Sequence, residues 1–440
     1  MQSNIRRSLL LLPSFSVRAP LPGGRPCMAR NDKEIEDLAG FQPGVIVGGK
    51  WKIIDLLDEG GYGKVYRVQD ITSLNPILYA ALKIESSNMD GGSAIKLEKA
   101  VLEKIHERGR RAHVPTLYRS MKRKNVCYMI ITLLGSSLRR IKDQHFPTGY
   151  PLKCWSKVAI QCLYAIKVVH DSGFLHRDIK AANFVFGQAG DPKIARMVYI
   201  LDFGLARQYA MEDPRRKGFY RPRKARPHTD FRGTMNFASP AMHDGAELGR
   251  KDDLWSLLFM LIDLHATLPW ANCDTVEEIG KVKQNLKDEE LMTKMPPEML
   301  PVPKHLRSLD VYNRPDYHLI YSCLHAVFKR CKANWYEPYE WESKDMVARN
   351  LSAQVNGQPA YVGPAEFFKE DIIGIDKGPS KLDQSGEDLL NRPSMPRSNG
   401  NTAPTRTSTS TDKFSRARYS RNTRKKKGQE KDKDKKGETI

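Results

Sequence analysis

Apolar and polar positions divide this chain of 440 residues into a patterned middle and two ends of different composition. In the middle, apolar residues recur every three or four positions through KLEKAVLEKI at 96–105, which predicts a helix with one buried face. The continuous apolar run AALKIE at 80–85 predicts a strand. Two strand-like runs flank the glycines of LLDEGGYGKVYRV at 56–68, so we expect two strands joined by a glycine-rich turn.

The C-terminal end loses this periodicity at about residue 376 and becomes rich in Ser, Thr, Asn, Lys and Arg. Between 401 and 440 there are 13 Lys or Arg and 5 Asp or Glu. Such a segment buries too little apolar surface to offset its chain entropy, so 376–440 is predicted to be a disordered basic tail. Its stretch TRKKKGQEKDKDKK at 423–436 fits a nuclear localisation signal, a polyanion-binding segment, or a solvated tail with no single partner.

The N-terminal end contains five arginines and no acidic residue before Asp32. Mitochondrial transit peptides have this composition, but a disordered extension over 1–45, or a gene model that begins upstream of a true start at Met28, explains it more simply. We therefore do not expect mitochondrial targeting.

Charge and cysteine content restrict the class of protein. The net charge of +21 and the pI near 9.6 favour acidic partners such as phosphorylated proteins, acidic protein tails, nucleic acid or anionic membrane, without choosing among them. The seven cysteines form no CxxC pair and lie mostly in apolar runs, which indicates reduced, buried thiols and a cytoplasmic or nuclear protein. The sequence has no apolar run of about 18 residues or more, so we expect no membrane-spanning helix.

Two strings carry the candidate chemistry. They are HRDIKAANF at 176–184 and DFGLARQY at 202–209. HRD and DFG are each common tripeptides, and most such residues cap helices or close turns. Together, and preceded by the glycine-rich turn and the lysine of AALKIE, they closely resemble the catalytic domain of protein kinases.

The resemblance implies specific roles for four of these residues. Asp178 would take the proton from a substrate hydroxyl, and Lys180 would meet the charge of the transferring phosphoryl group. Asn183 and Asp202 would hold magnesium ions.

The resemblance also implies a nucleotide site. Lys83 would pair with the α- and β-phosphates of ATP, and Glu98 on the predicted helix would orient Lys83. Residues 132–134 would form the hinge beside the adenine. The expected nucleotide-binding residues are Leu57, Gly60, Gly61, Gly63, Val65, Ala81, Lys83, Ile131, Leu133, Leu134 and Val185.

Further motifs narrow the family. These are TLLGSSL at 132–138, FRGTMNFAS at 231–239, GRKDDLWSLLFMLIDL at 249–264, LPW at 268–270, RPDY at 314–317 and WYEPYEWE at 335–342. They resemble the casein kinase 1 superfamily and, within it, the tau-tubulin kinase branch. This implies an α+β fold with a mostly β N-terminal lobe and a mostly helical C-terminal lobe, a kinase domain over 51–343, and a C-terminal extension over 344–375. Asp253 would anchor the catalytic loop, and Thr234 would reach towards Asp178, as in serine/threonine kinases.

Two positions depart from the family pattern. Asp58 replaces the first glycine of the glycine-rich loop, where a carboxylate either weakens nucleotide binding or faces solvent. Asn236 stands where the casein kinase 1 group usually has an arginine that reads a phosphate or acidic group on the substrate. Residues 211–232, however, carry eight Lys or Arg and three acidic residues. This segment either favours acidic substrates, in place of the missing arginine, or is a solvated basic loop.

The sequence therefore predicts a monomeric serine/threonine protein kinase that uses ATP and Mg²⁺. Its substrates would be proteins, of acidic or cytoskeletal type, rather than nucleic acid. The alternative is a pseudokinase or scaffold with a polyanion-binding basic tail, suggested by Asp58 and by the tail.

Overall fold

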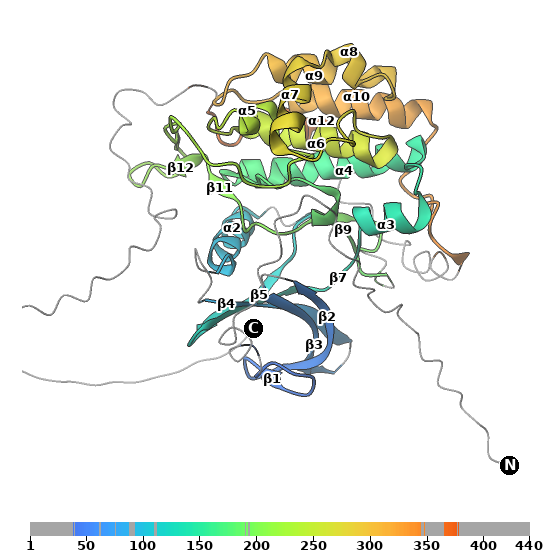
Figure 1. The fold of residues 1–440 in the computed structure, drawn as a ribbon. Coiled ribbons are helices and arrows are strands. Elements are labelled where there is room, and N and C mark those ends of the chain that lie inside the picture. Colours follow the sequence, from blue (N-terminus) through green and yellow to red (C-terminus); the bar gives the residue numbers. More distant parts are fainter. Residues whose placement is uncertain are drawn as a thin grey trace, which may run out of the picture. The chain divides into compact units, whose positions relative to one another are not determined.

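The described part of the chain is an antiparallel sheet followed by a mainly helical region (Figure 1). The computed structural model describes residues 38, 40–60, 63–74, 76–87, 93–109, 112–189, 191, 194–344, 347, 365–375 and 377. Of the segments predicted to be disordered, 376–440 lies outside the described residues except for residue 377, and 1–45 except for residues 38 and 40–45. Within the latter, Leu38 is buried in the core of the sheet and Phe41 packs against that core, so these residues are not disordered as predicted. The predicted α+β kinase fold is confirmed.

The N-terminal sheet has the strand order β1-β2-β3-β4-β6-β5, and all of its neighbouring strands are antiparallel. Its strands are β1 (Ile46–Val47), β2 (Trp51–Gly60), β3 (Gly63–Leu74), β4 (Ile77–Ser86), β5 (Leu117–Arg123) and β6 (Val126–Thr132). One face packs around Trp51, Ile53, Val68 and Leu82, all of which are buried. The glycine-rich turn joins β2 to β3, as the sequence predicts.

The helix α2 (Ile95–Glu107) packs against the sheet and is slightly longer than the predicted span. Its buried residues are Ile95, Glu98, Val101, Leu102 and Ile105. Val101, Leu102 and Ile105 belong to the predicted repeat, whose Leu97 is only partly buried; Ile95 precedes the predicted span, and Glu98 is a carboxylate. Burial of Glu98 on this face requires a cationic partner, because an isolated buried charge is strongly destabilising.

The helical region is built around α4 (Leu152–Asp171) and α6 (Arg250–His265), which are buried along almost their whole length. The indole of Trp155 donates a hydrogen bond of 2.8 Å to the Leu261 carbonyl and joins the two helices. The other helices are α3 (Leu138–His145), α5 (Pro240–His243), α7 (Val276–Asn285), α8 (Asp288–Leu291), α9 (Pro301–Arg307), α10 (Tyr317–Arg330), and the 3-10 turns η1 (Ala181–Asn183) and η2 (Pro297–Met299).

Short strands connect these helices and carry the candidate site. They are β7 (Leu134–Ser137), β8 (Phe174–Leu175), β9 (Phe184–Gly187), β10 (Val198–Ile200), β11 (Arg207–Gln208), β12 (Ala210–Glu212) and β13 (Tyr220–Pro222). They pair as β10-β9-β7, β11-β8 and β12-β13. The pairing of β9 with β10 places the residues after HRD beside those before DFG.

Residues 365–375 return to the helical region and pack on it. They begin with α12 (Ala365–Lys369), whose Phe368 is fully buried and stacks on Tyr321 of α10 with a ring separation of 4.9 Å. Further along, Ile373 and Ile375 are buried against Ala210 of β12. This part of the predicted extension is thus folded onto the region that carries the candidate site.

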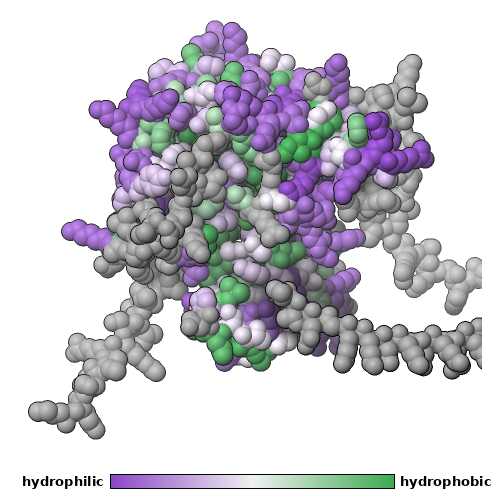
Figure 2. Space-filling view, turned by 180° about the vertical axis from the view of Figure 1, so that it is seen from behind, coloured by the Kyte–Doolittle hydropathy of each residue, from purple (hydrophilic) through white to green (hydrophobic). Residues whose placement is uncertain are grey.

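The surface is mostly polar over the helical region in the face that Figure 2 shows, and more apolar at the sheet. Exposed apolar residues of the sheet include Ile71, Leu74 and Ile77. Within the described residues, the six cysteines form no disulfide, and no helix is long and apolar enough to cross a membrane.

Candidate active site

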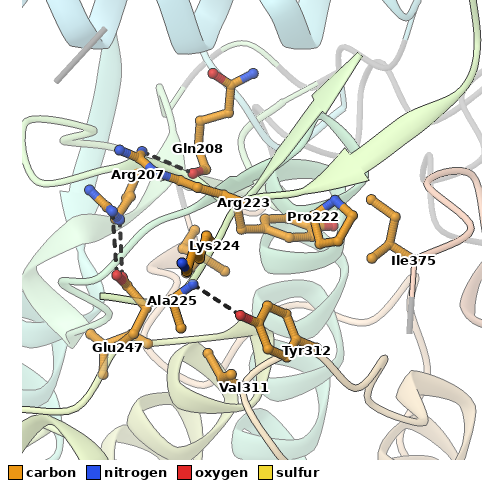
Figure 3. A pocket seen from close by; sticks show the side chains of 13 residues that line it. Arg207, Gln208, Pro222, Arg223, Lys224, Ala225, Glu247, Val311, Tyr312 and Ile375 are labelled. Carbon is orange, nitrogen blue, oxygen red and sulfur yellow. Dashed lines mark hydrogen bonds and ion pairs between the residues drawn. The ribbon is translucent and has the colours of Figure 1, made fainter. Parts of the chain in front are cut away.

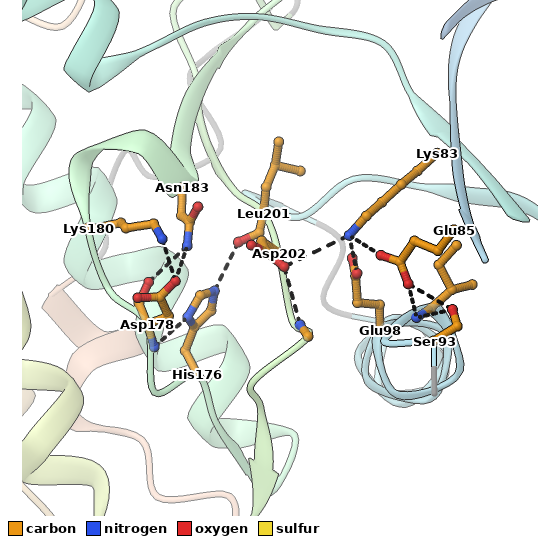
Figure 4. A network of polar contacts seen from close by, with 12 residues as sticks. Lys83, Glu85, Ser93, Glu98, His176, Asp178, Lys180, Asn183, Leu201 and Asp202 are labelled. Carbon is orange, nitrogen blue, oxygen red and sulfur yellow. Dashed lines mark hydrogen bonds and ion pairs between the residues drawn. The ribbon is translucent and has the colours of Figure 1, made fainter. Parts of the chain in front are cut away.

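A lysine on the sheet and a carboxylate on α2 form the first part of the site (Figure 4). Lys83 Nζ forms an ion pair with Glu98 Oε1, as the sequence predicts. The same Nζ lies 3.2 Å from Glu85 Oε1 and 3.9 Å from Asp202 Oδ1. Three carboxylates therefore converge on one ammonium group. Burial acts to lower the pKa of Lys83, but attraction to these carboxylates outweighs it, raises the pKa above its ordinary value and keeps the lysine charged.

The catalytic loop forms the second part. Lys180 Nζ donates to Asp178 Oδ2 at 2.6 Å, and Thr234 Oγ1 donates to Asp178 Oδ1 at 2.8 Å. The amide of Asn183 donates to the backbone oxygen of Asp178 at 2.9 Å and to its Oδ2 at 3.3 Å. The structure thus brings Asp178, Lys180, Asn183 and Thr234 together, and both carboxylate oxygens of Asp178 are oriented by neighbours.

A buried carboxylate on α6 holds the catalytic loop from below. Asp253 accepts hydrogen bonds from the backbone N–H groups of His176, at 2.7 Å, and Arg177, at 2.8 Å. His170 Nε2 lies 2.8 Å from the same carboxylate. Although burial acts to raise the pKa of Asp253, the hydrogen bond with His170 and the two backbone donors lower it, so the anchor is ionised. Arg177 has φ 65°, a left-handed conformation that such anchoring over-determines.

His176 links this loop to the residue before Asp202. Its Nε2 lies 3.0 Å from the Leu201 carbonyl, and Asp202 itself has φ 66°. Figure 4 shows Asp202 between the lysine group and the catalytic loop. Burial acts to raise the pKa of Asp202, but Lys83 and nearby cations lower it, which keeps the carboxylate ionised.

The glycine-rich turn is described except for residues 61–62, so the predicted Gly61 lies outside the described residues. A Cβ on Gly63 would lie 1.9 Å from the Ile84 carbonyl oxygen, whereas a Cβ on Gly60 would meet nothing within 4 Å. Gly63 is therefore required by close contact with β4. Asp58 is exposed, and its Oδ1 accepts a 2.9 Å hydrogen bond from the Glu59 N–H.

The other predicted nucleotide residues lie on paired strands. In the sheet, Ala81 is opposite Ile131, and Val65 is opposite Lys83. Val185 pairs with Ser137 across β9 and β7. Of the remaining three, Leu57 lies on β2, Leu133 directly precedes β7, and Leu134 is the first residue of β7. Their contact with adenine remains a prediction.

The residues present fit magnesium. Asn183 turns its amide nitrogen to Asp178, so its amide oxygen faces the other way (Figure 4). The carboxylate of Asp202 is 48% exposed. Mg²⁺ takes oxygen ligands and is usually held by one or two protein groups together with phosphates. The described residues contain no group of three or more His, Cys, Asp or Glu that could hold a metal.

The activation segment, residues 202–239, carries a cluster of guanidinium groups. Arg207 Nε and Arg226 Nε both pair with Glu247, at 3.0 and 2.7 Å. Burial and repulsion from Arg207, Arg226 and Arg232 lower the pKa of Arg177 to about 9. This cluster therefore contains more guanidinium groups than the single carboxylate of Glu247 can neutralise.

A small pocket lies behind this segment (Figure 3). Its lining includes Arg207, Tyr312 and Ile375, and it shares no residue with the predicted nucleotide site. The backbone N–H of Ala225 donates to the Tyr312 hydroxyl at 3.0 Å across it. The pocket marks the junction between the activation segment and residues 365–375, and is not where the catalytic side chains meet.

Comparison with known proteins agrees with this geometry. The sequence model of the protein kinase domain matches residues 51–334, which include every described side chain of the two groups in Figure 4. The chain belongs to the protein kinase family. Family membership implies ATP as the phosphoryl donor and proteins as substrates.

Relatives of this protein kinase include tau-tubulin and casein kinase I proteins, which confirms the predicted resemblance. It is 38% identical over 313 residues to a Caenorhabditis elegans protein named "Putative serine/threonine-protein kinase", covering 71% of this chain and 87% of the relative. It is 36% identical to an inactive tau-tubulin kinase of the same organism, covering 57% of this chain and 87% of the relative. Casein kinase I homolog 3 of Schizosaccharomyces pombe is 29% identical, over 67% of this chain and 66% of that protein.

Sequence reasoning missed several supports of the kinase site. Glu85 was part of the predicted strand, and the structure makes it a second carboxylate on Lys83. Glu247 holds two arginines, and Lys283 and Trp270 hold the end of the activation segment. Glu85 could have been found from its i+2 spacing on the strand, since alternate residues of a strand share a face. The others carry no local signal.

Proposed function

We propose that this protein kinase is active and transfers the γ-phosphate of ATP to serine and threonine hydroxyls of proteins. One observation carries the proposal. Lys83 is paired with Glu98 and approaches Asp202, while Asp178 is held by Lys180, Asn183 and Thr234. Both conditions for phosphoryl transfer, an oriented lysine and a positioned carboxylate, are met together.

The chain's own residues account for the transfer. Lys83 would hold the α- and β-phosphates, and backbone N–H groups of the glycine-rich turn would approach the phosphates. Asp178 would accept a hydrogen bond from the substrate hydroxyl, orient its oxygen towards the γ-phosphorus and receive its proton. The hydroxyl oxygen would bond to phosphorus as the bond to the β-phosphate oxygen breaks, in line and without a covalent enzyme intermediate. Lys180 would stabilise the charge on the transferring group.

Asn183 and Asp202 would hold Mg²⁺ through an amide oxygen and a carboxylate oxygen. When bound, the metal supplies positive charge to the phosphates. Removal of free Mg²⁺ by EDTA is expected to abolish transfer, and added Mg²⁺ is expected to restore it.

Serine and threonine are favoured as acceptors by the 2.8 Å contact of Thr234 with Asp178, an arrangement that serine/threonine kinases share. The basic activation segment, with its excess of guanidinium groups, favours acidic protein segments near the acceptor. The names of the tau-tubulin relatives add cytoskeletal proteins as a substrate class.

The test measures transfer of labelled phosphate from ATP to casein, followed by phosphoamino acid analysis. The full chain is expected to label serine or threonine, and Asp178→Asn is expected to lower the rate roughly 100-fold to 10,000-fold, the range of general-base contributions. Asp274→Asn, a change at an exposed aspartate whose backbone N–H bonds to Glu278, serves as the matched control.

The competing function is a nucleotide-binding scaffold, because one relative is named inactive. ATP binding without transfer by the wild-type chain would favour the scaffold and overturn the proposed activity. Phosphorylation of a peptide library by an active chain would then show whether acidic residues near the acceptor are selected.

A further inference from the structure

The segment that follows Thr234 is held by side chains from distant parts of the chain. The backbone carbonyls of Met235 and Ala238 both accept hydrogen bonds from Lys283 Nζ, each at 2.8 Å. The carbonyl between them, of Asn236, accepts a 3.0 Å hydrogen bond from the indole of Trp270. The side chains of Lys283 and Trp270 thus bind three of the four backbone carbonyls of residues 235–238.

This short segment is directly coupled to the reacting group. Thr234 Oγ1 donates to Asp178, and the Thr234 carbonyl accepts from the N–H groups of Phe237 and Ala238, each at 3.0 Å. The turn therefore moves with Thr234. On its other side Gly233 has φ 96°, and a Cβ there would lie 2.8 Å from the Arg177 carbonyl oxygen, so the segment also fits closely against the catalytic loop.

Lys283 is an unusual residue for a purely structural role. It lies on α7 and is 3% exposed. Its Nζ lies 5.0 Å from the ring centre of Phe259 and 4.7 Å from that of Trp270. No described carboxylate lies within ion-pair distance of this ammonium group, although buried lysines are almost always paired with one.

Among the residues that the structure describes, the other polar neighbour of this amine is a histidine, since His243 Nε2 lies 3.3 Å from Nζ. Burial lowers the pKa of Lys283 to about 6, so the amine is mostly neutral at pH 7. A neutral amine donates two hydrogen bonds and accepts one. Its two N–H donors match the two carbonyls of residues 235 and 238.

We propose that Lys283 is a positioning residue of this kinase, which holds residues 235–238 and thereby sets Thr234 against Asp178 where the substrate hydroxyl binds. The inference rests on the proposed kinase activity. It predicts that Lys283 affects use of the protein substrate and not of ATP, because its hydrogen bonds go to the segment that follows Thr234 and to none of the predicted nucleotide-binding residues.

The test compares Lys283→Met with Lys281→Met in the full chain. Methionine keeps the apolar stem and removes the N–H donors, and Lys281 is the exposed lysine two residues earlier on α7. For casein, kcat/KM of Lys283→Met is expected to fall about 10-fold to 100-fold, since small misplacements near the reacting atoms have effects of this size. KM for ATP is expected to stay within about twofold, and Lys281→Met is expected to match wild type.

A double variant separates positioning from loss of structure. If Lys283 acts through Thr234, adding Lys283→Met to Thr234→Val lowers kcat/KM little beyond Thr234→Val alone. Full additivity of the two effects, or an equal loss of ATP affinity, would overturn the proposal. Lys283→Gln, which retains an N–H₂ donor, is expected to recover part of the activity and serves if Lys283→Met does not fold.

A readout independent of catalysis distinguishes this inference from the proposed function. Amide hydrogen exchange of Lys283→Met is expected to rise in 234–239 and to stay unchanged in 176–183. That result supports the anchoring role even if the wild-type chain transfers no phosphate, an outcome that would overturn only the kinase activity. Unchanged exchange in 234–239 would contradict the anchoring itself.

Discussion

The catalytic loop and the activation segment are held in opposite ways. The loop, residues 176–183, is anchored by a single buried carboxylate, Asp253, and by contacts among its own residues, to which Thr234 and the Leu201 carbonyl add one contact each. The activation segment has no such single anchor. It is bound at several points by Glu247, Trp270, Lys283 and other residues that are far away in the sequence.

This difference in anchoring corresponds to the different tasks of the catalytic loop and the activation segment. A loop that must place one carboxylate and its neighbours benefits from a rigid, local arrangement whose geometry is over-determined. A segment that must receive protein substrates is supported piece by piece, from Trp270, α7 and residues 365–375. Loss of one support should therefore be severe in the first region and graded in the second.

The sharpest test removes the single anchor of the catalytic loop. Asp253→Ala leaves two buried N–H groups and His170 without their acceptor. We expect kcat to fall at least about 100-fold, and the free energy of unfolding to fall by about 1–3 kcal/mol for each buried donor left without an acceptor. Casein phosphorylation and thermal unfolding measure both, with Asp274→Ala as control. A loss of kcat smaller than that caused by variants of the activation-segment supports would contradict the contrast between the two regions.

A second test removes one distributed support. Phe368→Ala empties a fully buried position that ties residues 365–375 to α10. The expected loss of stability is about 3–5 kcal/mol, from transfer and cavity terms, while kcat at low temperature should change less than about threefold because Glu247, Trp270 and Lys283 still hold the segment. Chemical unfolding and steady-state assays at 10–15 °C, roughly where the fold is most stable, are the measurements. Loss of activity as large as in Asp253→Ala would show that 365–375 is itself an essential anchor.

A third test uses pH and concerns Lys283. Its pKa is about 6 in the fold and near its ordinary value of 10.5 when unfolded, so between these values the unfolded chain binds one more proton. Stability from this group therefore rises with pH, with a slope of up to about 1.4 kcal/mol per pH unit. Between pH 7 and 9 the wild type should gain stability relative to Lys283→Met. A difference that does not change with pH would mean that Lys283 is charged in the fold.

The smallest effect is expected at Asp58, which belongs to neither region. Its carboxylate is exposed and bonded to the next N–H. Asp58→Gly is therefore expected to change KM for ATP by less than about twofold, since exposed charges interact weakly through water. An ATP titration checks this. A tenfold decrease in KM would show that the carboxylate does oppose the phosphates.

The sequence by itself determined the catalytic half of this protein. Asp178, Lys180 and Asn183 lie within one string, and their mutual contacts require only that the string form a tight loop. The resemblance to protein kinases also implied the pairing of Lys83 with Glu98, which the structure forms between β4 and the buried face of α2. Periodicity placed both elements to within a few residues.

The residues that support the activation segment could be found only from the tertiary structure. Lys283 appears in the sequence as one more lysine on a polar helix, and only the packing of α7 reveals that it is buried beneath two carbonyls. Likewise Ile373 and Ile375 lie outside the matched kinase domain, yet they pack on β12. The physical reason is that backbone carbonyls and apolar surfaces accept partners of many sequences. Such contacts leave no motif, and only the fold shows which residue meets them.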